Sequence, residues 1–590
     1  MRNHSTPIFI ALLLGSMISA CKPAERNTPL KPNVLVILTD DQGWGDLSVQ
    51  GNTNLSTPNV DRLAAEGARL QQFFVAPVCS PTRAEFLTGR YSQRLGVTFI
   101  DHGEERMNLG EITIADIFRE AGYATGAFGK WHNGSEYPYH PTGRGFDQFY
   151  GMIEGSWANY FSPLLDSCGK VVRGEGFIAD DFTNKAMDFI EKNKNQPFFC
   201  YLPYNTPHTP LQVPDEYWNR FKDKELKMRH HYIEEKDDYT RAVLAMCENI
   251  DWNVGRIMQK LEDLGLKENT IVVYFSDNGP DFYRWIDGLR DKKASTNEGG
   301  VRVPMFMRWP GHIEAGKSIP QISTVIDLLP TLADLAGLSA SVPDSVDGIS
   351  LVPLLTGNPS NWEERIIINA WRNQVSVRSQ RFRLDHKGDL FDMVNDRGQD
   401  TIVNDRHPMV YKELSGAADR FRADVMTIET PYRPHTIGHP GTRYNNLPVG
   451  IALIEGGIER SNRWTNCSYL QHWTSTEDRI TYDVEVQGTG TFEAALYYTC
   501  PPEDVGSLIR LSLNGKAVEA RVTHGHNPPL TGMENDRVPR TESYEKEWAV
   551  LEMGTIDLEP GTGTLTLQAL EIPGDEVLDL HLLTLTRQTE

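Results

Sequence analysis

Four apolar runs in the first half of the chain share one design. Each is rich in β-branched, aliphatic or aromatic residues and stops at a polar or glycine signal, at 33–39, 123–128, 197–203 and 270–276. This pattern predicts strands that are buried on both faces of a parallel sheet. Residues whose side chains can bind metals or take part in catalysis follow these runs, namely Asp40, Asp41, Lys130, His132, His208, Asp277 and Asn278.

Amphipathic helical stretches lie between these runs, at 57–70, 113–123 and 242–266. The alternation of strands and helices predicts an α/β domain with helices on both faces of its sheet. Open sheets of this kind bind ligands at the carboxyl ends of their strands. We therefore expect the residues that follow the four runs to lie together at one edge of the sheet.

The pattern changes in the second half of the chain. After the α/β domain at 32–363, short runs followed by a helical stretch predict a small antiparallel subdomain at 364–430. The segment 431–449 is rich in Pro, Gly and Asn and is interpreted as a linker. From 450 to 590 the hydrophobic period is two, and Asn514-Gly515 between two runs predicts a hairpin. An appended β-sandwich is the expected fold of this last part.

The N-terminus has the features of an export signal. Arg2 precedes a short apolar run, which is too short to span a membrane stably, and the run ends at Ile18-Ser19-Ala20-Cys21. These four residues resemble the bacterial lipobox, which implies cleavage before Cys21 and a lipid on its sulfur. We expect a signal peptide at 1–20, a tether at 21–31 and an exported, lipid-anchored bacterial protein in the periplasm or on the outer-membrane surface. The alternative is a plain signal peptide with an incidental cysteine.

Charge and cysteine content narrow the classes of function. The 58 basic and 80 acidic residues give a net charge of −22, which argues against a nucleic-acid partner. An anionic substrate would therefore need a local cluster of cations, or a metal. Among the seven cysteines, Cys467 and Cys500 lie in the same region and could form a disulfide in an oxidising compartment.

The acidic strand ends have the chemistry of a metal site. Asp40, Asp41, Asp277 and Asn278 offer three carboxylates and one amide without sulfur, which suits a hard cation, Ca²⁺ first and Mg²⁺ as the alternative. Each pair taken alone is also typical of an ordinary turn after a strand. Two matching strand ends in one sheet favour the metal site.

A group of cations and donors could hold an oxyanion nearby. Its members are Arg83, Lys130, His132, His208 and Lys293. Trp131 separates Lys130 from His132, a spacing that would point both the same way. The helix expected after Cys79 adds free N–H groups and a dipole that favour an anion.

Several motifs resemble the type I sulfatase family. "CSPTR" followed by "LTGR" at residues 79–90 resembles the family signature, and "ILTDDQGWGDLS", "FGKWHNG", "NTPHTPL", "FSDNGP" and "NEGGVRVPMFMRWPG" occur in the family's order. The resemblance covers roughly residues 32 to 430. It implies an alkaline-phosphatase-like fold with a mixed or parallel sheet and a small antiparallel C-terminal subdomain.

The resemblance assigns a role to Cys79. In that family the cysteine is oxidised to Cα-formylglycine (3-oxoalanine) by a formylglycine-generating or an anaerobic sulfatase-maturating enzyme. The hydrated aldehyde attacks sulfur, and its second hydroxyl lets the enzyme expel sulfate afterwards. Pro81 and Arg83 would belong to the tag that the maturation enzyme reads.

The same resemblance distributes the other roles by motif. Asp40, Asp41, Asp277, Asn278 and the diol at residue 79 would bind one Ca²⁺, and Arg83 and Lys130 would hold the diol and sulfate charge. His132 resembles the base that collapses the hemiacetal, and His208 with Lys293 resembles the pair that protonates the leaving oxygen and grips the sulfate. The role of Lys293 is implied by the alignment of "LRDKKASTNEGG" with a family stretch, in which Lys292 is the adjacent residue. The chain departs from the family at Thr82, Asn133 and Asn297, and none of these changes removes a catalytic group.

The expected function is hydrolysis of sulfate esters on a carbohydrate, an oligo- or polysaccharide such as algal ulvan. The alternatives are a surface carbohydrate-binding protein with an inactive sulfatase domain, and a phosphodiesterase or phosphonate hydrolase on the same fold. The β-sandwich resembles modules that accompany polysaccharide-active enzymes. Its Trp464, Tyr469 and Trp473 either stack on sugar rings or fill the core of a purely structural domain.

Overall fold

The computed structural model describes residues 1, 31–101, 103–231, 233–357 and 362–588. The expected signal peptide, the lipidated Cys21 and the tether up to residue 30 lie outside the described residues. In the part of the chain that is described, no helix is both long and apolar enough to cross a membrane.

The four apolar runs form the centre of an 11-stranded mixed sheet. The strands β8, β1, β7 and β3 are neighbours in that order and run parallel, with Leu35 of β1 between Val272 of β8 and Cys200 of β7. The full order is β11-β2-β10-β8-β1-β7-β3-β4-β5-β6, with β9 paired to β2. The strands are β1 (Asn33–Thr39), β2 (Ala68–Phe74), β3 (Ala124–Phe128), β4 (Gln148–Gly151), β5 (Leu164–Ser167), β6 (Lys170–Arg173), β7 (Phe198–Pro203), β8 (Thr270–Ser276), β9 (Arg302–Val303), β10 (Met305–Arg308) and β11 (Lys317–Thr324).

Helices cover both faces of this sheet, as predicted. Leu35 and Ile37 of β1 pack into a core with α1, α4 and α6, whereas Val34, Val36 and Leu38 pack into a second core with α2, α3 and α8. This alternation explains why the strand reads as a continuous apolar run. The helices are α1 (Pro58–Ala65), α2 (Cys79–Thr88), α3 (Ile114–Glu120), α4 (Ile178–Lys192), α5 (Asp215–Phe221), α6 (Asp237–Asp263), α7 (Glu298–Val301), α8 (Leu328–Leu335) and α9 (Val352–Leu355).

The helix predicted over 57–70 is shorter than expected. It ends at Ala65, and its last predicted residues belong to β2, which pairs with β10 and β11. Gly67 lies at the switch, where a Cβ would approach the carbonyl oxygen of Met307 to 2.3 Å. Strand pairing with distant segments therefore overrides the local helical pattern.

A small antiparallel sheet and one helix follow the α/β domain, as predicted. The sheet has the order β12-β13-β14-β15 and packs on α10. Its elements are β12 (Ile367–Trp371), β13 (Gln374–Arg378), β14 (Phe382–Leu384), β15 (Leu390–Asp392) and α10 (Pro408–Asp424).

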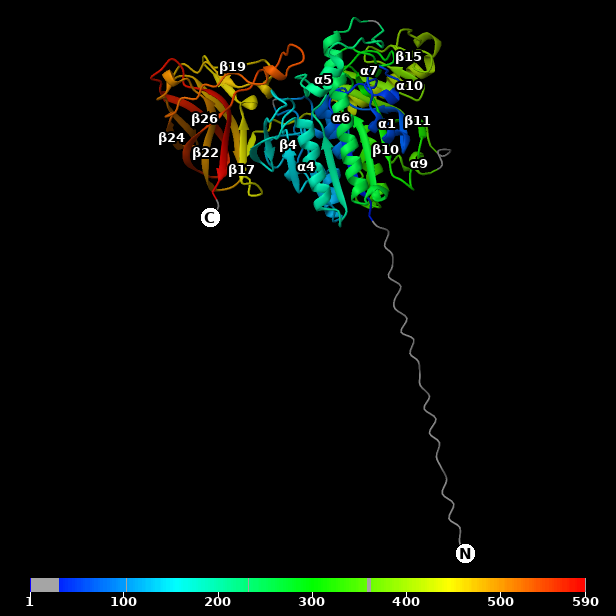
Figure 1. The fold of residues 1–590 in the computed structure, drawn as a ribbon, viewed down its shortest axis with the longest axis horizontal. Helices are drawn as coiled ribbons and strands as arrows, with labels where there is room; N and C mark the ends of the chain where they lie inside the picture. Colours follow the sequence, from blue (N-terminus) through cyan, green and yellow to red (C-terminus); the bar gives the residue numbers. More distant parts are fainter. Residues whose placement is uncertain (2–30, 102, 232, 358–361, 589–590) are drawn as a thin grey trace.

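The C-terminal part is a β-sandwich of two six-stranded sheets (Figure 1). One sheet has the order β16-β21-β26-β23-β24 with β18 on β21, and the other has β19-β20-β27-β22-β25 with β17 on β27. The strands are β16 (His435–Ile437), β17 (Tyr444–Pro448), β18 (Leu453–Glu455), β19 (Glu459–Arg460), β20 (Leu470–Gln471), β21 (Arg479–Val486), β22 (Gly490–Thr499), β23 (Leu508–Leu513), β24 (Lys516–Arg521), β25 (Ala549–Leu558), β26 (Gly561–Glu571) and β27 (Asp579–Arg587).

Three expectations for this region have different outcomes. Asn514 and Gly515, at φ 49° and 81°, join β23 to β24 as the predicted two-residue hairpin. The segment 431–449, predicted to be a linker, instead contributes β16 and β17, because each finds a partner strand far along the chain. Cys467 and Cys500 are both free, so the suggested disulfide is absent.

A buried ion cluster joins the α/β domain to the small sheet. Glu298 of α7 is fully buried, and its Oε1 lies 2.7 Å from Nε of Arg378 on β13 and 3.5 Å from Nε of Arg383 on β14. Burial alone would raise the pKa of Glu298, but Arg378, Arg383 and Arg302 outweigh it and lower the pKa to about 2. One carboxylate therefore keeps several buried guanidinium groups compensated.

Glu298→Gln should lower the free energy of unfolding by about 3–5 kcal/mol near neutral pH, because it leaves buried arginines without their counter-charge. The folded pKa of Glu298 is below that of the unfolded chain, so its contribution is complete above pH 4.5 and is lost as the pH falls toward about 2. Urea denaturation at several pH values measures the difference between variant and wild type, which should shrink with acidification.

The matched control is Glu262→Gln, which removes a surface carboxylate paired with Lys267 at 2.8 Å. Surface pairs contribute little to stability, so this variant should unfold close to wild type. Equal losses in the two variants would contradict a special role for the buried cluster.

Candidate active site

The residues that follow the four central strands lie together at one edge of the sheet. Asp41, which follows β1, donates its backbone N–H to Oδ1 of Asp277, which follows β8, at 3.1 Å. Asn278 donates from Nδ2 to Oδ1 of Asp41 at 2.7 Å. Asp40, Asp277 and Asn278 are fully buried. Asp41 has φ 65°, a left-handed conformation that is uncommon outside glycine and is concentrated at functional sites.

Helix α2 brings the signature cysteine to the same edge. Cys79 is the first residue of α2 and is 2% exposed. Its Sγ and one carboxylate oxygen each of Asp40 and Asp277 lie within 4.8 Å of one another. One turn later, Arg83 donates from Nη2 to Oδ2 of Asp277 at 2.8 Å and from Nη1 to the carbonyl oxygen of Lys130 at 2.8 Å. The helix is thus tied to two strand ends by one guanidinium.

Two lysines compensate the remaining carboxylates. Lys130 donates from Nζ to Oδ2 of Asp40 at 2.6 Å, and Nζ of Lys293 lies 2.7 Å from Oδ1 of Asp41. Burial would raise the pKa of Asp40, but Lys130 and the cations around it lower it. Burial would likewise lower the pKa of Lys293, and Asp41 raises it above the usual value. Lys292 instead donates from Nζ to the backbone oxygen of Asp281 at 2.6 Å. Of the two lysines, Lys293 is therefore the one that contacts the carboxylates at the strand ends.

The predicted histidines lie at the same edge with different surroundings. Nε2 of His132 lies 2.7 Å from the carbonyl oxygen of Ile100, which requires the proton on Nε2 and leaves a lone pair on Nδ1. Burial, followed by the nearby Lys130, lowers the pKa of His132 well below its usual value, so the ring is neutral at neutral pH. His208 is partly exposed, with Nδ1 2.7 Å from the carbonyl oxygen of Thr209 and Nε2 3.7 Å from Oδ2 of Asp41.

The donor set fits a hard divalent cation. Oδ1 of Asp40 and Oδ1 of Asn278 are buried and have no hydrogen-bond partner among the described residues, which is costly for polar atoms unless a ligand uses them. The donors around them are carboxylate and amide oxygens, the ligands that Ca²⁺ and Mg²⁺ prefer. Burial, followed by the neighbouring Asp40, raises the pKa of Asp277 well above its usual value, which a bound cation would counteract. The formal charges of the three carboxylates and of Arg83, Lys130 and Lys293 balance, so a divalent ion would leave the cluster positive.

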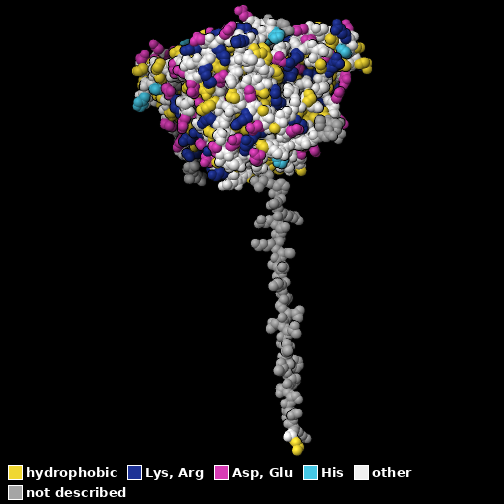
Figure 2. Space-filling model, turned by 45° about the vertical axis from the view of Figure 1, so that its right-hand side comes forward, with side chains coloured by type: hydrophobic (Ala, Val, Ile, Leu, Met, Phe, Trp, Pro, Cys, Tyr) yellow, Lys and Arg dark blue, Asp and Glu magenta, His cyan; other side chains and the backbone are white. Residues whose placement is uncertain are grey.

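The face of the molecule in Figure 2 has no comparable segregation of charge. On the face shown in Figure 2, acidic and basic side chains are interspersed. With a net charge of −22, the protein cannot attract an anion through its overall field. A positive site must therefore be local, as the cluster at the sheet edge would be with a divalent ion bound.

Two family models match the chain. The sulfatase model matches residues 32–338, and the model described as the C-terminal part of N-sulphoglucosamine sulphohydrolase matches residues 286–393. The chain belongs to the sulfatase family. It is a sulfuric ester hydrolase, and its mixed sheet with a small antiparallel subdomain is the alkaline-phosphatase-like fold that the sequence motifs imply.

Relatives and solved structures agree with this assignment. The sulfatase is 32% identical to the N-acetylgalactosamine-6-sulfatase of Canis lupus familiaris over 377 residues, which covers 58% of this chain and 69% of the relative. It is 30% identical to the steryl-sulfatase of Rattus norvegicus over 472 residues, which covers 63% and 78% of the two chains. The crystal structure of Ps i-CgsB in complex with k-i-k-neocarrahexaose is similar with a TM-score of 0.61 at 29% identity, covering 67% of this chain and 93% of that one.

A cavity of about 330 Å³ opens above this sheet edge. Cys79, His132, His208 and Lys293 of the sulfatase fold line its floor. Part of its wall comes from the β-sandwich, through Trp464, Thr465, Asn466 and residues 538–542. These wall residues were not predicted as site residues, because they are far from the sulfatase motifs in the sequence. Of these wall residues, only Trp464 was singled out from the sequence, as a candidate for stacking on sugar rings.

Chelator-treated protein should gain thermal stability when Ca²⁺ or Mg²⁺ is added, because a ligand that binds only the native state stabilises it. Asp277→Asn removes a charged donor and should abolish most of that rise in Tm. Differential scanning fluorimetry with each ion in turn measures both effects, and the ion that gives the larger rise at equal concentration is the preferred one.

Asp281→Asn provides the control, since Asp281 lines the same cavity but belongs to neither of the ligand groups found among the described residues. Its Tm should still rise with the ion. A full rise in Asp277→Asn, or a loss in both variants, would argue against the ligand set.

Proposed function

We propose that this sulfatase removes sulfate esters from a sulfated oligo- or polysaccharide, with Cys79 matured to Cα-formylglycine and one Ca²⁺ held beside it. The observation that carries the proposal is the position of Cys79. It begins α2 at the floor of the cavity, with its Sγ within 4.8 Å of the metal-ligand oxygens of Asp40 and Asp277. A nucleophile formed at this residue would meet substrate and ion together.

The chain's own residues can be assigned to the steps of sulfate transfer. Asp40, Asp41, Asp277 and Asn278 would hold the ion. The matured residue would supply a hydrated aldehyde as nucleophile, and the ion would draw charge from the sulfate oxygens. Arg83 and Lys130 place positive charge beside residue 79.

Proton transfer would fall to the two histidines. His132 is neutral, and its Nδ1 can accept the proton that is lost when sulfate is expelled. His208 reaches the cavity from the loop after β7, and its Nδ1 donates to the carbonyl oxygen of Thr209. The doubly protonated ring can therefore donate a proton from Nε2 to the leaving oxygen. Lys293 would stabilise negative charge in the same cavity, which it lines, while its Nζ lies 2.7 Å from Oδ1 of Asp41.

A carbohydrate substrate is supported by the relatives and by the cavity. The related mammalian enzyme is named for a sulfated amino sugar, and the structure of Ps i-CgsB is a complex with k-i-k-neocarrahexaose. The cavity combines charged groups at its floor with polar and aromatic residues in its wall. We include algal polymers such as ulvan among the candidate substrates. Within the described residues, the two metal-compatible groups share Asp40 and form one site, which favours sulfate over the two-metal phosphoester chemistry of this fold.

We also propose that the protein is exported and anchored by a lipid on Cys21, in the periplasm or on the outer-membrane surface. The support is the sequence pattern at residues 2–21. Maturation would then need a formylglycine-generating or anaerobic sulfatase-maturating enzyme to reach Cys79 before the domain closes, because the folded residue is 2% exposed.

Coexpression with a maturation enzyme should give a protein that releases sulfate from one or more members of a panel of sulfated oligosaccharides. Cys79→Ala should abolish release, because the nucleophile is gone. Ion chromatography measures free sulfate, and mass spectrometry of the peptide that contains residue 79 reports the aldehyde. Cys168→Ala, which changes an exposed cysteine outside the cavity, is the control and should retain activity.

Absence of sulfate release despite a confirmed aldehyde would contradict the proposal. Release of phosphate from phosphodiesters by the same sample would support the phosphoester alternative. Tight oligosaccharide binding without any turnover would support an inactive, carbohydrate-binding protein.

His208→Ala should affect substrates according to their leaving groups. A sugar alkoxide is a poor leaving group and needs the proton, whereas 4-nitrophenolate leaves without one. General-acid catalysis contributes about 10²–10⁴-fold, so kcat on the sugar sulfate should fall by about that factor and far less on 4-nitrophenyl sulfate. Steady-state kinetics on both substrates test this, and equal losses would show that His208 is not the acid.

A further inference from the structure

An excursion of the β-sandwich reaches the catalytic domain beside its active site. It lies between β24 and β25 (Figure 1). Arg537 donates its backbone N–H to the carbonyl oxygen of Leu211 at 3.1 Å, and Gln212 donates from Nε2 to the carbonyl oxygen of Gly532 at 2.9 Å. Tyr239 of α6 donates its hydroxyl to the carbonyl oxygen of Pro539 at 3.0 Å. The excursion is thus bonded to the segment that follows His208.

Arg540 fixes the shape of this excursion. Its guanidinium pairs with Asp536 and donates to the carbonyl oxygen of Ala158 in the catalytic domain. Only 2% of the Arg540 side chain is exposed. A buried, multiply bonded arginine at this point holds residues 538–542 in one position relative to the cavity.

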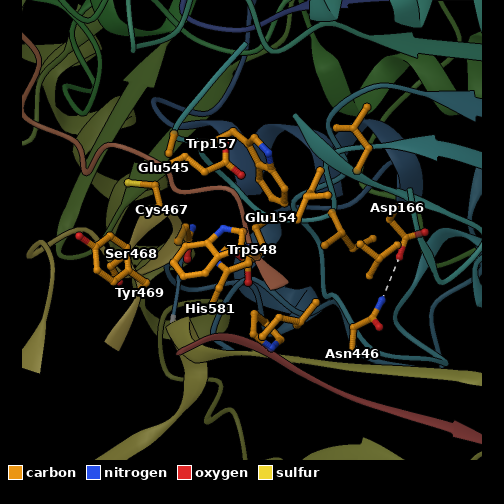
Figure 3. Close-up of a pocket in the computed structure, with 18 of the residues that line it drawn as sticks. Glu154, Trp157, Asp166, Asn446, Cys467, Ser468, Tyr469, Glu545, Trp548 and His581 are labelled. Carbon is orange, nitrogen blue, oxygen red and sulfur yellow. Dashed lines mark hydrogen bonds between the residues drawn. The ribbon is translucent and has the colours of Figure 1, made fainter. Parts of the chain in front are cut away.

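Packing elsewhere in the interface fixes the orientation of the sandwich itself. Figure 3 shows Trp157 and Glu154 of the catalytic domain facing Tyr469, Trp548 and His581 of the sandwich across an apolar cavity of about 80 Å³. The rings of Trp548 and His581 are stacked, with centroids 4.8 Å apart. Trp548 belongs to the end of the excursion, whereas Tyr469 and His581 lie outside it, so the sandwich also faces the catalytic domain through residues outside the excursion.

The sandwich places an acidic group at the edge of the sulfate pocket. Glu542 lines the same cavity as Cys79 and accepts a hydrogen bond from the hydroxyl of Thr209, the residue after His208. Its carboxylate oxygens accept hydrogen bonds and repel anions. A neutral hydroxyl is a better partner than a second sulfate at this place.

Trp464 supplies an aromatic surface in the same wall. Trp464 is 43% exposed, while Trp473 and Tyr469 are only 1% and 8% exposed. The Arg463 guanidinium carbon lies 4.4 Å from the centroid of the Trp464 ring, and Trp464 lines the cavity that contains Cys79. Of the three aromatic residues that the sequence singles out, Trp464 is therefore the one in reach of a substrate.

We propose that residues 463–466 and 538–542 of the β-sandwich form a saccharide subsite of the active site. In this subsite, Trp464 stacks on the sugar ring next to the sulfated one, and Glu542 accepts a hydrogen bond from a hydroxyl of that ring. Aromatic side chains with a few placed polar groups are the usual lining of such pockets. The proposal rests on the carbohydrate sulfatase function above and adds that recognition extends to a second sugar, read by the appended domain.

The test compares substrates of different length. Trp464→Ala should lower kcat/KM for a sulfated oligosaccharide at least about tenfold more than for 4-nitrophenyl sulfate, mainly through KM, because the small ester does not reach the wall. Trp464→Phe keeps an aromatic face and should recover most of the loss. Glu542→Gln should also lower kcat/KM more for the oligosaccharide than for 4-nitrophenyl sulfate, but by a smaller factor than Trp464→Ala.

Trp252 offers a matched control on α6. It is 44% exposed and has the Arg256 guanidinium carbon 4.6 Å from its ring, but it does not line this cavity. Trp252→Ala should leave both substrates at wild-type rates. A loss shared equally by the two substrates in Trp464→Ala, or no loss in either, would overturn the subsite.

Binding gives a readout that is independent of turnover. Isothermal titration of Cys79→Ala with the best oligosaccharide should show binding that weakens at least about tenfold when Trp464→Ala is added. If wild type releases no sulfate but this binding difference persists, the proposed reaction fails while the subsite stands. If no oligosaccharide binds, or both proteins bind equally, the subsite is overturned whatever the activity.

Discussion

The active site depends on placing three buried carboxylates next to three cations. Asp40, Asp41 and Asp277 are at most 2% exposed, and a charge removed from water costs several kcal/mol unless an opposite charge compensates it. Each has its own cation, supplied by Lys130, Lys293 and Arg83. Because these charges cancel, a bound divalent ion would set the sign of the site. An acidic protein can in this way present a positive pocket to an anionic ester.

The order of strands in the sheet makes this charge cluster possible. β8, β1, β7 and β3 are neighbours, although long segments separate them in the chain. Their carboxyl ends bring acids, a lysine and two histidines to one edge, and α2 adds Cys79 and Arg83 from one face. Arg83 is bonded to the ends of both β8 and β3, so a change at this residue would affect the nucleophile, the metal ligands and Lys130 together.

The sequence predicted the parts of the molecule whose signals are local. The buried strands, the hairpin at Asn514-Gly515 and the residues at the sheet edge follow from short patterns, and the resemblance to sulfatases added the role of Cys79. The segment 431–449 has no such local pattern. Its strand β17 forms by pairing with β27, more than 130 residues further along the chain, so the strand could not be predicted from the segment itself. The wall residues Glu542 and Trp464 depend likewise on how two domains pack, which no local pattern encodes.

Because the excursion between β24 and β25 reaches the active site, two separate parts of the chain line the cavity. Its floor comes from residues between 79 and 293 and part of its wall from residues 464–466 and 538–542, and neither family model extends to that part of the wall. Insertions, deletions or recombination in the coding region of the β-sandwich can therefore change which substrates the cavity admits without altering the nucleophile. The reaction and the choice of substrate can then change at different rates during evolution.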